Sequence, residues 1–183
     1  MKRLVIHPRD RSTAFLTKVY ENLDDVTVVQ CGVSKPDLKE MVRSHDQIMM
    51  MGHGSPYGLF SVGQFPGASG YIIDHSFAPQ LAGNNSSVFI WCNADEYVNH
   101  NSLKGFCTGM FISEVAEAIL MGLGGTTQRE VDDSNESFVE TIGAFADQGP
   151  QLMHAAAKHR YGQLTSHNRV AKYNHERLYV CGA

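Results

Sequence analysis

The sequence lacks any long apolar run. Its first apolar stretch, Leu4–Ile6, is only three residues long, which is too short for the core of a signal peptide. The longest amphipathic stretch, Met110–Leu123, is interrupted by Ser113, Glu114 and Glu117, whereas a membrane-spanning helix needs about 20 mainly apolar residues. We therefore expect a cytoplasmic protein that has no membrane partner.

Basic charge and paired cysteines are also scarce. Lys and Arg number 15 against 19 Asp and Glu, and the formal net charge of −4 predicts no basic surface for nucleic acid. The one short cationic cluster is Lys158–Arg160. The four cysteines contain no C-x-x-C pair and are too few for a disulfide scaffold, so we expect reduced thiols at Cys31, Cys92, Cys107 and Cys181.

What the sequence does contain is the composition of an ordinary globular protein, with 43% hydrophobic and 19% charged residues in a chain of 183. This length predicts a single domain over residues 1–183. Four short apolar runs alternate with helical patterns, which is typical of a mostly parallel sheet with helices on both faces. The predicted fold is three-layer α/β/α, with strands in Leu4–Ile6, Val26–Cys31, Ile48–Met51 and Val88–Trp91.

Local signals indicate the connections. Ser34, followed by Pro36 and Asp37, predicts a helix start, and the Gly- and Pro-rich residues 52–70 predict a loop or hairpin. Residues 93–108 are polar and predict a second loop. We expect the strongest helix over 110–123, a helix capped by Asp133 and Glu136, a helix starting at Gly149-Pro150, and a closing strand over 178–181.

Two residues of chemical interest directly follow predicted strands. His53 comes after the run Ile48–Met51, and Cys92 comes after Val88–Trp91. Functional crevices of open α/β sheets lie beyond the carboxyl ends of the strands, so both side chains are expected at one edge of the sheet. A free thiol is only about 3% ionised at pH 7, and a neighbouring imidazolium lowers its pKa and can protonate a leaving amine. The alternative is a buried structural thiol and a turn histidine, which are each common.

The order strand, His53-Gly54, loop, weak helix, strand, Cys92 resembles that of the caspase-like (clan CD) cysteine peptidases. The downstream segments Phe106–Met110 and Val131–Ser134 extend the likeness, which is closest to CHAT domains and covers roughly residues 46–160. The resemblance implies a caspase-like fold and a mechanism in which Cys92 attacks a peptide carbonyl and His53 acts as acid and base. The backbone amides of Gly54 and Cys92 would hold the oxyanion. Trp91 departs from the small residue that often precedes the nucleophile in caspases.

The substrate implied by this resemblance is a peptide or protein. Acidic side chains in predicted loops beside the site, namely Asp95, Glu96, Asp132 and Asp133, would complement a basic substrate side chain, although solvated surface carboxylates explain them equally well. No cofactor and no metal are expected, and the sequence does not specify protein partners. The competing hypothesis is a catalytically inactive caspase-like module with a binding or regulatory role, because a fold does not determine function.

Other kinds of site fit the sequence less well. Gly52-His53-Gly54 with Gly58 has the wrong spacing for a dinucleotide-binding loop. A phosphatase loop would need an arginine six positions after Cys92, where the chain has Val98. A zinc site would have to draw on widely spaced residues without the short ligand spacing of structural zinc, namely His53, His75, Cys92, His100 and Cys107.

Overall fold

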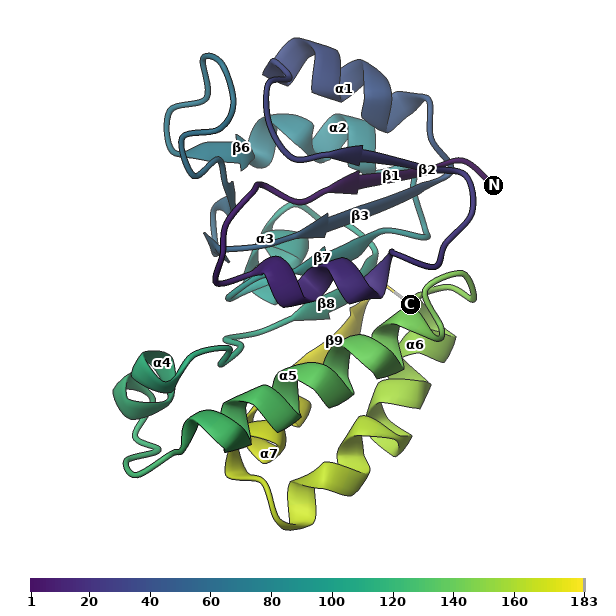
Figure 1. Ribbon diagram of the computed structural model, residues 1–183. Coiled ribbons are helices and arrows are strands. Elements are labelled where there is room, and N and C mark those ends of the chain that lie inside the picture. Colours follow the sequence, from purple (N-terminus) through teal and green to yellow (C-terminus); the bar gives the residue numbers. More distant parts are fainter. Residues whose placement is uncertain (183) are drawn as a thin grey trace.

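A sheet of six strands runs through the molecule in the order β2-β1-β3-β7-β8-β9. The structure is a computed structural model and describes residues 1–182 (Figure 1). The first five strands in this order are parallel, and β9 is antiparallel to β8. The fold is therefore mixed α/β with a mostly parallel sheet, as the sequence predicts. The strands are β1 (Arg3–Ile6), β2 (Val26–Val29), β3 (Gln47–Met51), β7 (Val88–Ile90), β8 (Gly105–Thr108) and β9 (Leu178–Cys181).

Helices cover both faces of this sheet. One face carries α1 (Lys35–Arg43), η2 (His75–Phe77), α2 (Ala78–Leu81) and α3 (Ala94–His100). The other carries η1 (Ala14–Val19), α5 (Gln128–Gly143), α6 (Pro150–His159), η3 (Tyr161–Ser166) and α7 (Arg169–His175). The short helix α4 (Val115–Leu120) projects away from both layers on the side where β1 and β3 end (Figure 1).

The central strands β3 and β7 are almost wholly apolar because a helix layer covers each of their faces, whereas the edge strand β2 is partly exposed. In β3, Ile48 and Met50 pack towards α1, whereas Met49 and Met51 pack towards α5. All four side chains are fully buried. A small antiparallel sheet follows β3 and consists of β4 (Gly54–Ser55), β5 (Gly58–Phe60) and β6 (Tyr71–Ile73). The hairpin expected in the glycine-rich segment is thus confirmed.

Several local signals act as predicted. The Ser34 side chain accepts a hydrogen bond from the Asp37 amide and caps α1, α6 begins at Pro150, and β9 spans Leu178–Cys181. The capping box predicted at Asp133 and Glu136 is wrong, since α5 already begins after Thr127, whose hydroxyl and Glu130 form the box. Among residues 1–182, no helix combines the length and apolar character needed to cross a membrane.

The predicted helix over 110–123 is also wrong, because only Val115–Leu120 is helical. Phe111 and Ile112 are buried in an irregular segment instead. The Asn174 side chain donates to the Ile112 carbonyl and accepts from the Ile112 amide, both at 2.8 Å. These long-range bonds satisfy the backbone groups that a helix would have used.

The polar loop predicted over 93–108 contains a helix and a strand. Helix α3 buries Ala94, Tyr97 and Val98 against the sheet. Strand β8 is fully buried between β7 and β9. Its sequence, Gly-Phe-Cys-Thr, is too short and too mixed to show an apolar run, and its neighbours on both sides make it a strand.

Candidate functional site

His53 and Cys92 line one small cavity beyond the carboxyl ends of β3 and β7. These strands are hydrogen-bonded neighbours, so the residues that follow them emerge side by side. The cavity has a volume of about 20 Å³, enough for one water molecule. Its wall also includes Thr13 and Phe15 from the segment after β1, and Phe111 from the irregular segment after β8. The segments after four strands, β1, β3, β7 and β8, therefore line one small space.

A chain of hydrogen bonds holds the His53 ring. Its Nε2 atom lies 2.6 Å from the Ser12 hydroxyl oxygen, and that hydroxyl donates to Asp10 Oδ1, also at 2.6 Å. Because serine has a single hydroxyl hydrogen, which goes to Asp10, the Ser12 oxygen accepts from His53 Nε2–H. Nε2 therefore carries the hydrogen in neutral His53, and Nδ1 holds the free lone pair. Nδ1 is the atom available as a base.

The carboxylate of Asp10 completes this chain. Oδ1 lies 3.9 Å from His53 Nε2, close enough to stabilise a positive charge on the ring. Hydrogen bonds from the Ser12 side chain and backbone lower the pKa of Asp10, so it is ionised at neutral pH. Sequence reasoning missed Asp10 and Ser12. The available signal was their position after the first strand, by the rule that selected His53 and Cys92.

The thiol of Cys92 is hydrogen-bonded to the backbone rather than to His53. It donates to the Phe111 carbonyl oxygen, with sulfur and oxygen 3.4 Å apart. Burial raises the pKa of Cys92 to about 11, and the negative charge of Glu117 adds to the effect. The expectation that an adjacent imidazolium lowers this pKa is wrong for the conformation seen here, because burial outweighs any such effect.

Trp91 and Gly54 fit against each other next to the cavity. The Trp91 indole is buried against Phe89 and Tyr97, with ring centroids 5.7 and 5.5 Å apart, and its Nε1 donates to the Ser55 carbonyl at 3.1 Å. A Cβ atom at Gly54 would lie 2.2 Å from Trp91 Cδ1. The glycine after His53 thus has a packing reason in addition to the oxyanion role predicted for its amide. Of the two residues whose amides were predicted to hold the oxyanion, Cys92 lines the cavity. Gly54 does not line it but follows His53, which does.

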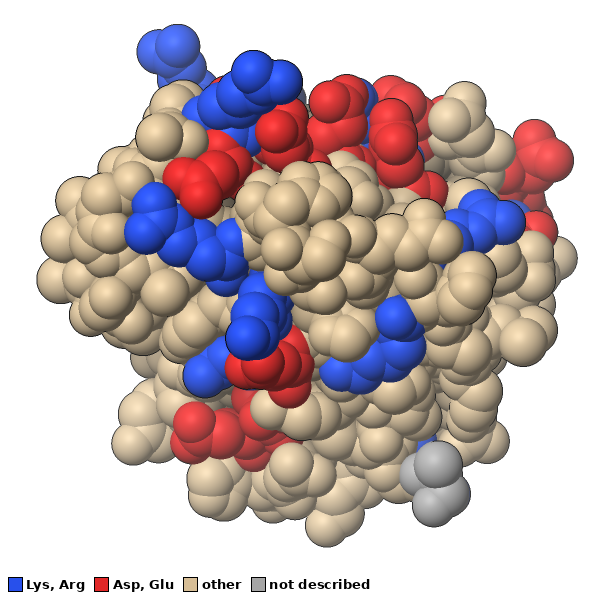
Figure 2. Space-filling view, turned by 90° about the horizontal axis from the view of Figure 1, so that it is seen from below, with Lys and Arg blue, Asp and Glu red and all other residues tan. Residues whose placement is uncertain are grey.

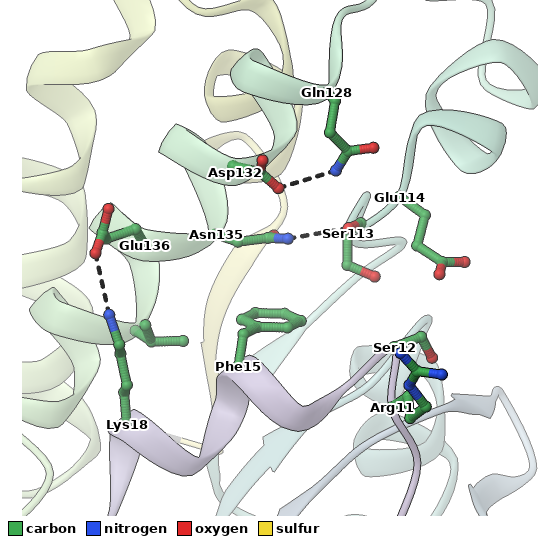
Figure 3. Close-up of a pocket in the computed structure, with 11 residues that line it drawn as sticks. Arg11, Ser12, Phe15, Lys18, Ser113, Glu114, Gln128, Asp132, Asn135 and Glu136 are labelled. Carbon is green, nitrogen blue, oxygen red and sulfur yellow. Dashed lines mark hydrogen bonds and ion pairs between the residues drawn. The ribbon is translucent and has the colours of Figure 1, made fainter.

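A larger cleft of about 440 Å³ lies next to this cavity and shares Phe15 and Ser113 with it. Figure 3 shows Arg11 and Ser12 on one side of this cleft and the first turns of α5 on the other. Asp132 projects from α5 and accepts a hydrogen bond from Gln128 at 2.9 Å. Glu114 lies at the rim, where sequence reasoning did not consider it.

The four predicted substrate-binding acids do not come together. Asp132 lines the larger cleft, whereas Asp133 points elsewhere and pairs with Arg129 at 3.7 Å. Asp95 and Glu96 are in the first turn of α3. Burial raises the pKa of Asp95, whose charge is felt by Cys107 and Tyr179, so it lies towards β8 and β9.

Charged side chains of both signs are spread over one face of the molecule. Lys and Arg side chains alternate with Asp and Glu side chains over the face in Figure 2, and wide areas carry neither. In the part of the chain from 1 to 182, no three His, Cys, Asp or Glu side chains are grouped so as to hold a metal ion.

Comparison with family models, with curated proteins and with solved structures finds no match for this chain.

Proposed function

We propose that this protein is a cysteine peptidase of the caspase-like type, with Cys92 as nucleophile and His53 as acid and base. The observation that carries the proposal is that His53 and Cys92 share one cavity while Ser12 and Asp10 occupy Nε2 of the imidazole, leaving Nδ1 for proton transfer. A nucleophile, a base and a group that orients the base are the three parts that acyl transfer requires.

The raised pKa of Cys92 defines how the first step proceeds. A substrate carbonyl that enters the crevice displaces the thiol from the Phe111 carbonyl. His53 Nδ1 takes the thiol proton as sulfur bonds to the carbonyl carbon, so no free thiolate is needed beforehand. The C–N bond then breaks, and the same proton goes to the leaving amine. Water, deprotonated by His53, hydrolyses the thioester and restores the thiol.

Ser12 and Asp10 are positioning residues in this scheme. When His53 Nδ1 accepts the thiol proton, the ring becomes positively charged and donates from both nitrogens. The Ser12 oxygen accepts from Nε2, and the Asp10 carboxylate neutralises the charge through Ser12. The chain thereby stabilises the charged ring in the transition state more than the neutral ring in the ground state.

The larger cleft supplies a place for a substrate side chain. Lys18 is paired with Glu136 at 3.0 Å, which leaves Glu114 and Asp132 as acids opposite Arg11. This balance favours a substrate with a Lys or Arg side chain next to the cleaved bond. Of the four predicted substrate-binding acids, Asp132 lines this cleft, and Glu114 lines it as well.

A second function, an inactive caspase-like binding module, is favoured by two observations. The cavity has room for only about one water molecule, and the pKa of the Cys92 thiol is about 11. Both are features of an ordinary buried cysteine. The two functions differ in whether Cys92 acts as a nucleophile. Mass spectrometry after exposure to peptide chloromethyl ketones, which alkylate a nucleophilic thiol with release of chloride, separates them.

The test uses the full chain and fluorogenic amides that carry Arg, Lys, Asp or Leu beside the cleaved bond. We expect cleavage after Arg or Lys, its loss in Cys92→Ser and His53→Asn, and a fall in kcat of about 10- to 100-fold in Ser12→Ala with KM little changed. Cys31→Ser and His45→Asn are the matched controls and retain activity. Ser12→Thr keeps the hydroxyl and restores most of kcat.

If the wild type cleaves none of these amides and Cys92 takes up no chloromethyl ketone, the peptidase proposal is abandoned. If cleavage persists in Cys92→Ser, the nucleophile is assigned wrongly. Thermal melting of every variant distinguishes lost chemistry from lost folding.

A further inference from the structure

Two further cysteines lie against each other on the sheet, on the side of α3. Cys107 is in β8 and Cys181 is in β9, and these strands are antiparallel neighbours. Cys107 pairs in register with Tyr179, so Cys181 is two residues further along and faces the same side. Their sulfur atoms are 2.9 Å apart, and each thiol is free. The two residues are 74 positions apart in sequence, and only the tertiary fold joins them.

We propose that Cys107 and Cys181 form an oxidation site, which closes to an intrachain disulfide when the protein meets a small disulfide such as oxidised glutathione. The inference is independent of the peptidase proposal. It also changes the expectation that every thiol in the chain stays reduced. Cys107 and Cys181 are the pair because their sulfur atoms are in contact, whereas the Cys92 thiol donates to Phe111.

The reaction proceeds in two exchanges. Cys181 is half-buried and reacts first: its thiolate attacks one sulfur of oxidised glutathione, breaks the S–S bond and releases one glutathione thiolate. The Cys107 thiolate then attacks the Cys181 sulfur of the mixed disulfide and releases the second glutathione. Two protein thiols are oxidised and one glutathione disulfide is reduced to two thiols, so atoms and electrons balance.

The surroundings of Cys107 determine the speed of the second exchange. Its side chain is fully buried, and burial raises its pKa, with Cys181 and Asp95 adding to the effect. Little thiolate forms at neutral pH, so ring closure should accelerate as the pH rises. The closeness of the two sulfur atoms works in the other direction, since it gives the second step a high effective concentration.

The Cys107–Cys181 disulfide would restrain β8, the strand whose Thr108 bonds to the backbone just before Cys92. Thr108 follows Cys107, and its hydroxyl donates to the Trp91 carbonyl at 2.8 Å and accepts from the Trp91 amide at 3.1 Å. Tying β8 to β9 covalently therefore restrains the backbone next to the nucleophile. It also closes a long loop in the unfolded chain, which raises the melting temperature by roughly 5–10 °C for a protein of this size.

The experiment incubates the full chain with oxidised and reduced glutathione at pH 8. We expect the intact mass of the Cys31→Ser variant to fall by two hydrogen atoms, a peptide that links Cys107 to Cys181 after digestion without reductant, and a higher melting temperature that dithiothreitol reverses. Wild type should form the same linked peptide and can carry one further glutathione on the exposed Cys31. Cys181→Ser and Cys107→Ser each abolish the mass loss, and two variants guard against one that fails to fold.

Three outcomes would overturn the proposal. The first is an unchanged mass after oxidation. The second is a glutathione that stays attached to Cys181 in wild type at pH 8 and at pH 9.5. The third is a linked peptide that contains Cys31 or Cys92. None of these bears on cleavage of the fluorogenic amides under reducing conditions, so failure here is distinct from failure of the peptidase proposal.

Discussion

Cys92 and Cys107 are both buried thiols, but they have different neighbours. Burial raises the pKa of both thiols. Cys92 lies beyond the end of β7, where the chain leaves the sheet and shares a cavity with His53 from the neighbouring strand end. Cys107 lies within β8, where the neighbouring strand presents Cys181. Position relative to the strand end thus decides whether a buried thiol meets a base or a second thiol.

Acid is expected to destabilise the fold around His7, at the strand-end region. His7 ends the run of β1 and bonds to Tyr20 and Thr13, and burial lowers its pKa from 6.5 to about 4. The unfolded chain therefore binds a proton that the folded chain does not. The stability from His7 is complete above pH 6.5 and is lost between pH 6.5 and 4, up to about 3 kcal/mol.

Urea unfolding at pH 7, 5.5 and 4 measures this loss. Glutamine in His7→Gln stays neutral, so the free energy of unfolding of this variant should change less between pH 6.5 and 4. His45→Gln serves as the matched control. If the loss of stability between pH 7 and 4 is equally steep in His7→Gln, the acid sensitivity belongs to another group, such as His154, whose pKa is also lowered by burial.

A methyl group at Gly54 should sharpen the comparison by disturbing the Cys92 region alone. The added Cβ in Gly54→Ala would meet Trp91 Cδ1 at 2.2 Å and the Gly58 carbonyl at 2.6 Å. We expect a loss of about 2–3 kcal/mol from overpacking, measured by urea unfolding. Gly83→Ala is the control, because no atom lies within 4 Å of its Cβ position. Equal stability of the two variants would contradict the tight fit between Gly54 and Trp91.

The variant Thr108→Val tests the link between the two regions and should have the smallest effect. Valine has nearly the same shape but leaves the buried Trp91 amide and carbonyl without the bonds that the Thr108 hydroxyl makes. We expect a loss of about 1–2 kcal/mol in urea unfolding. Alkylation of Cys92 by iodoacetamide should also become faster, since its backbone is less restrained. An unchanged alkylation rate would show that the two regions are independent.

The sequence predicted the part of the fold that repeats a simple pattern. Parallel strands appear as short apolar runs, so β1, β2, β3 and β7 could be predicted, as could the capping residue Ser34. Because His53 and Cys92 directly follow two of those runs, their common edge was predictable too. Their meeting also needed β3 and β7 to be neighbours, which sequence alone left open.

The rest depended on partners that lie far away in the chain. Asn174 bonds to the backbone of Ile112 and keeps it out of the helix that its periodicity predicts, and β8 is a strand because β7 and β9 flank it. Asp10, Ser12 and Glu114 look like ordinary loop residues until their neighbours are known.

The sequence by itself therefore determined the class of fold, most of the strands, and the placement of His53 and Cys92 at strand ends. Hydrophobic periodicity and strand ends are local properties. The tertiary structure decided the hydrogen-bond chain from His53 to Asp10, the raised pKa of Cys92 and the contact of Cys107 with Cys181. The physical reason is that hydrogen bonding and desolvation depend on distance in space. These groups come close only when strands distant in sequence pair in one sheet.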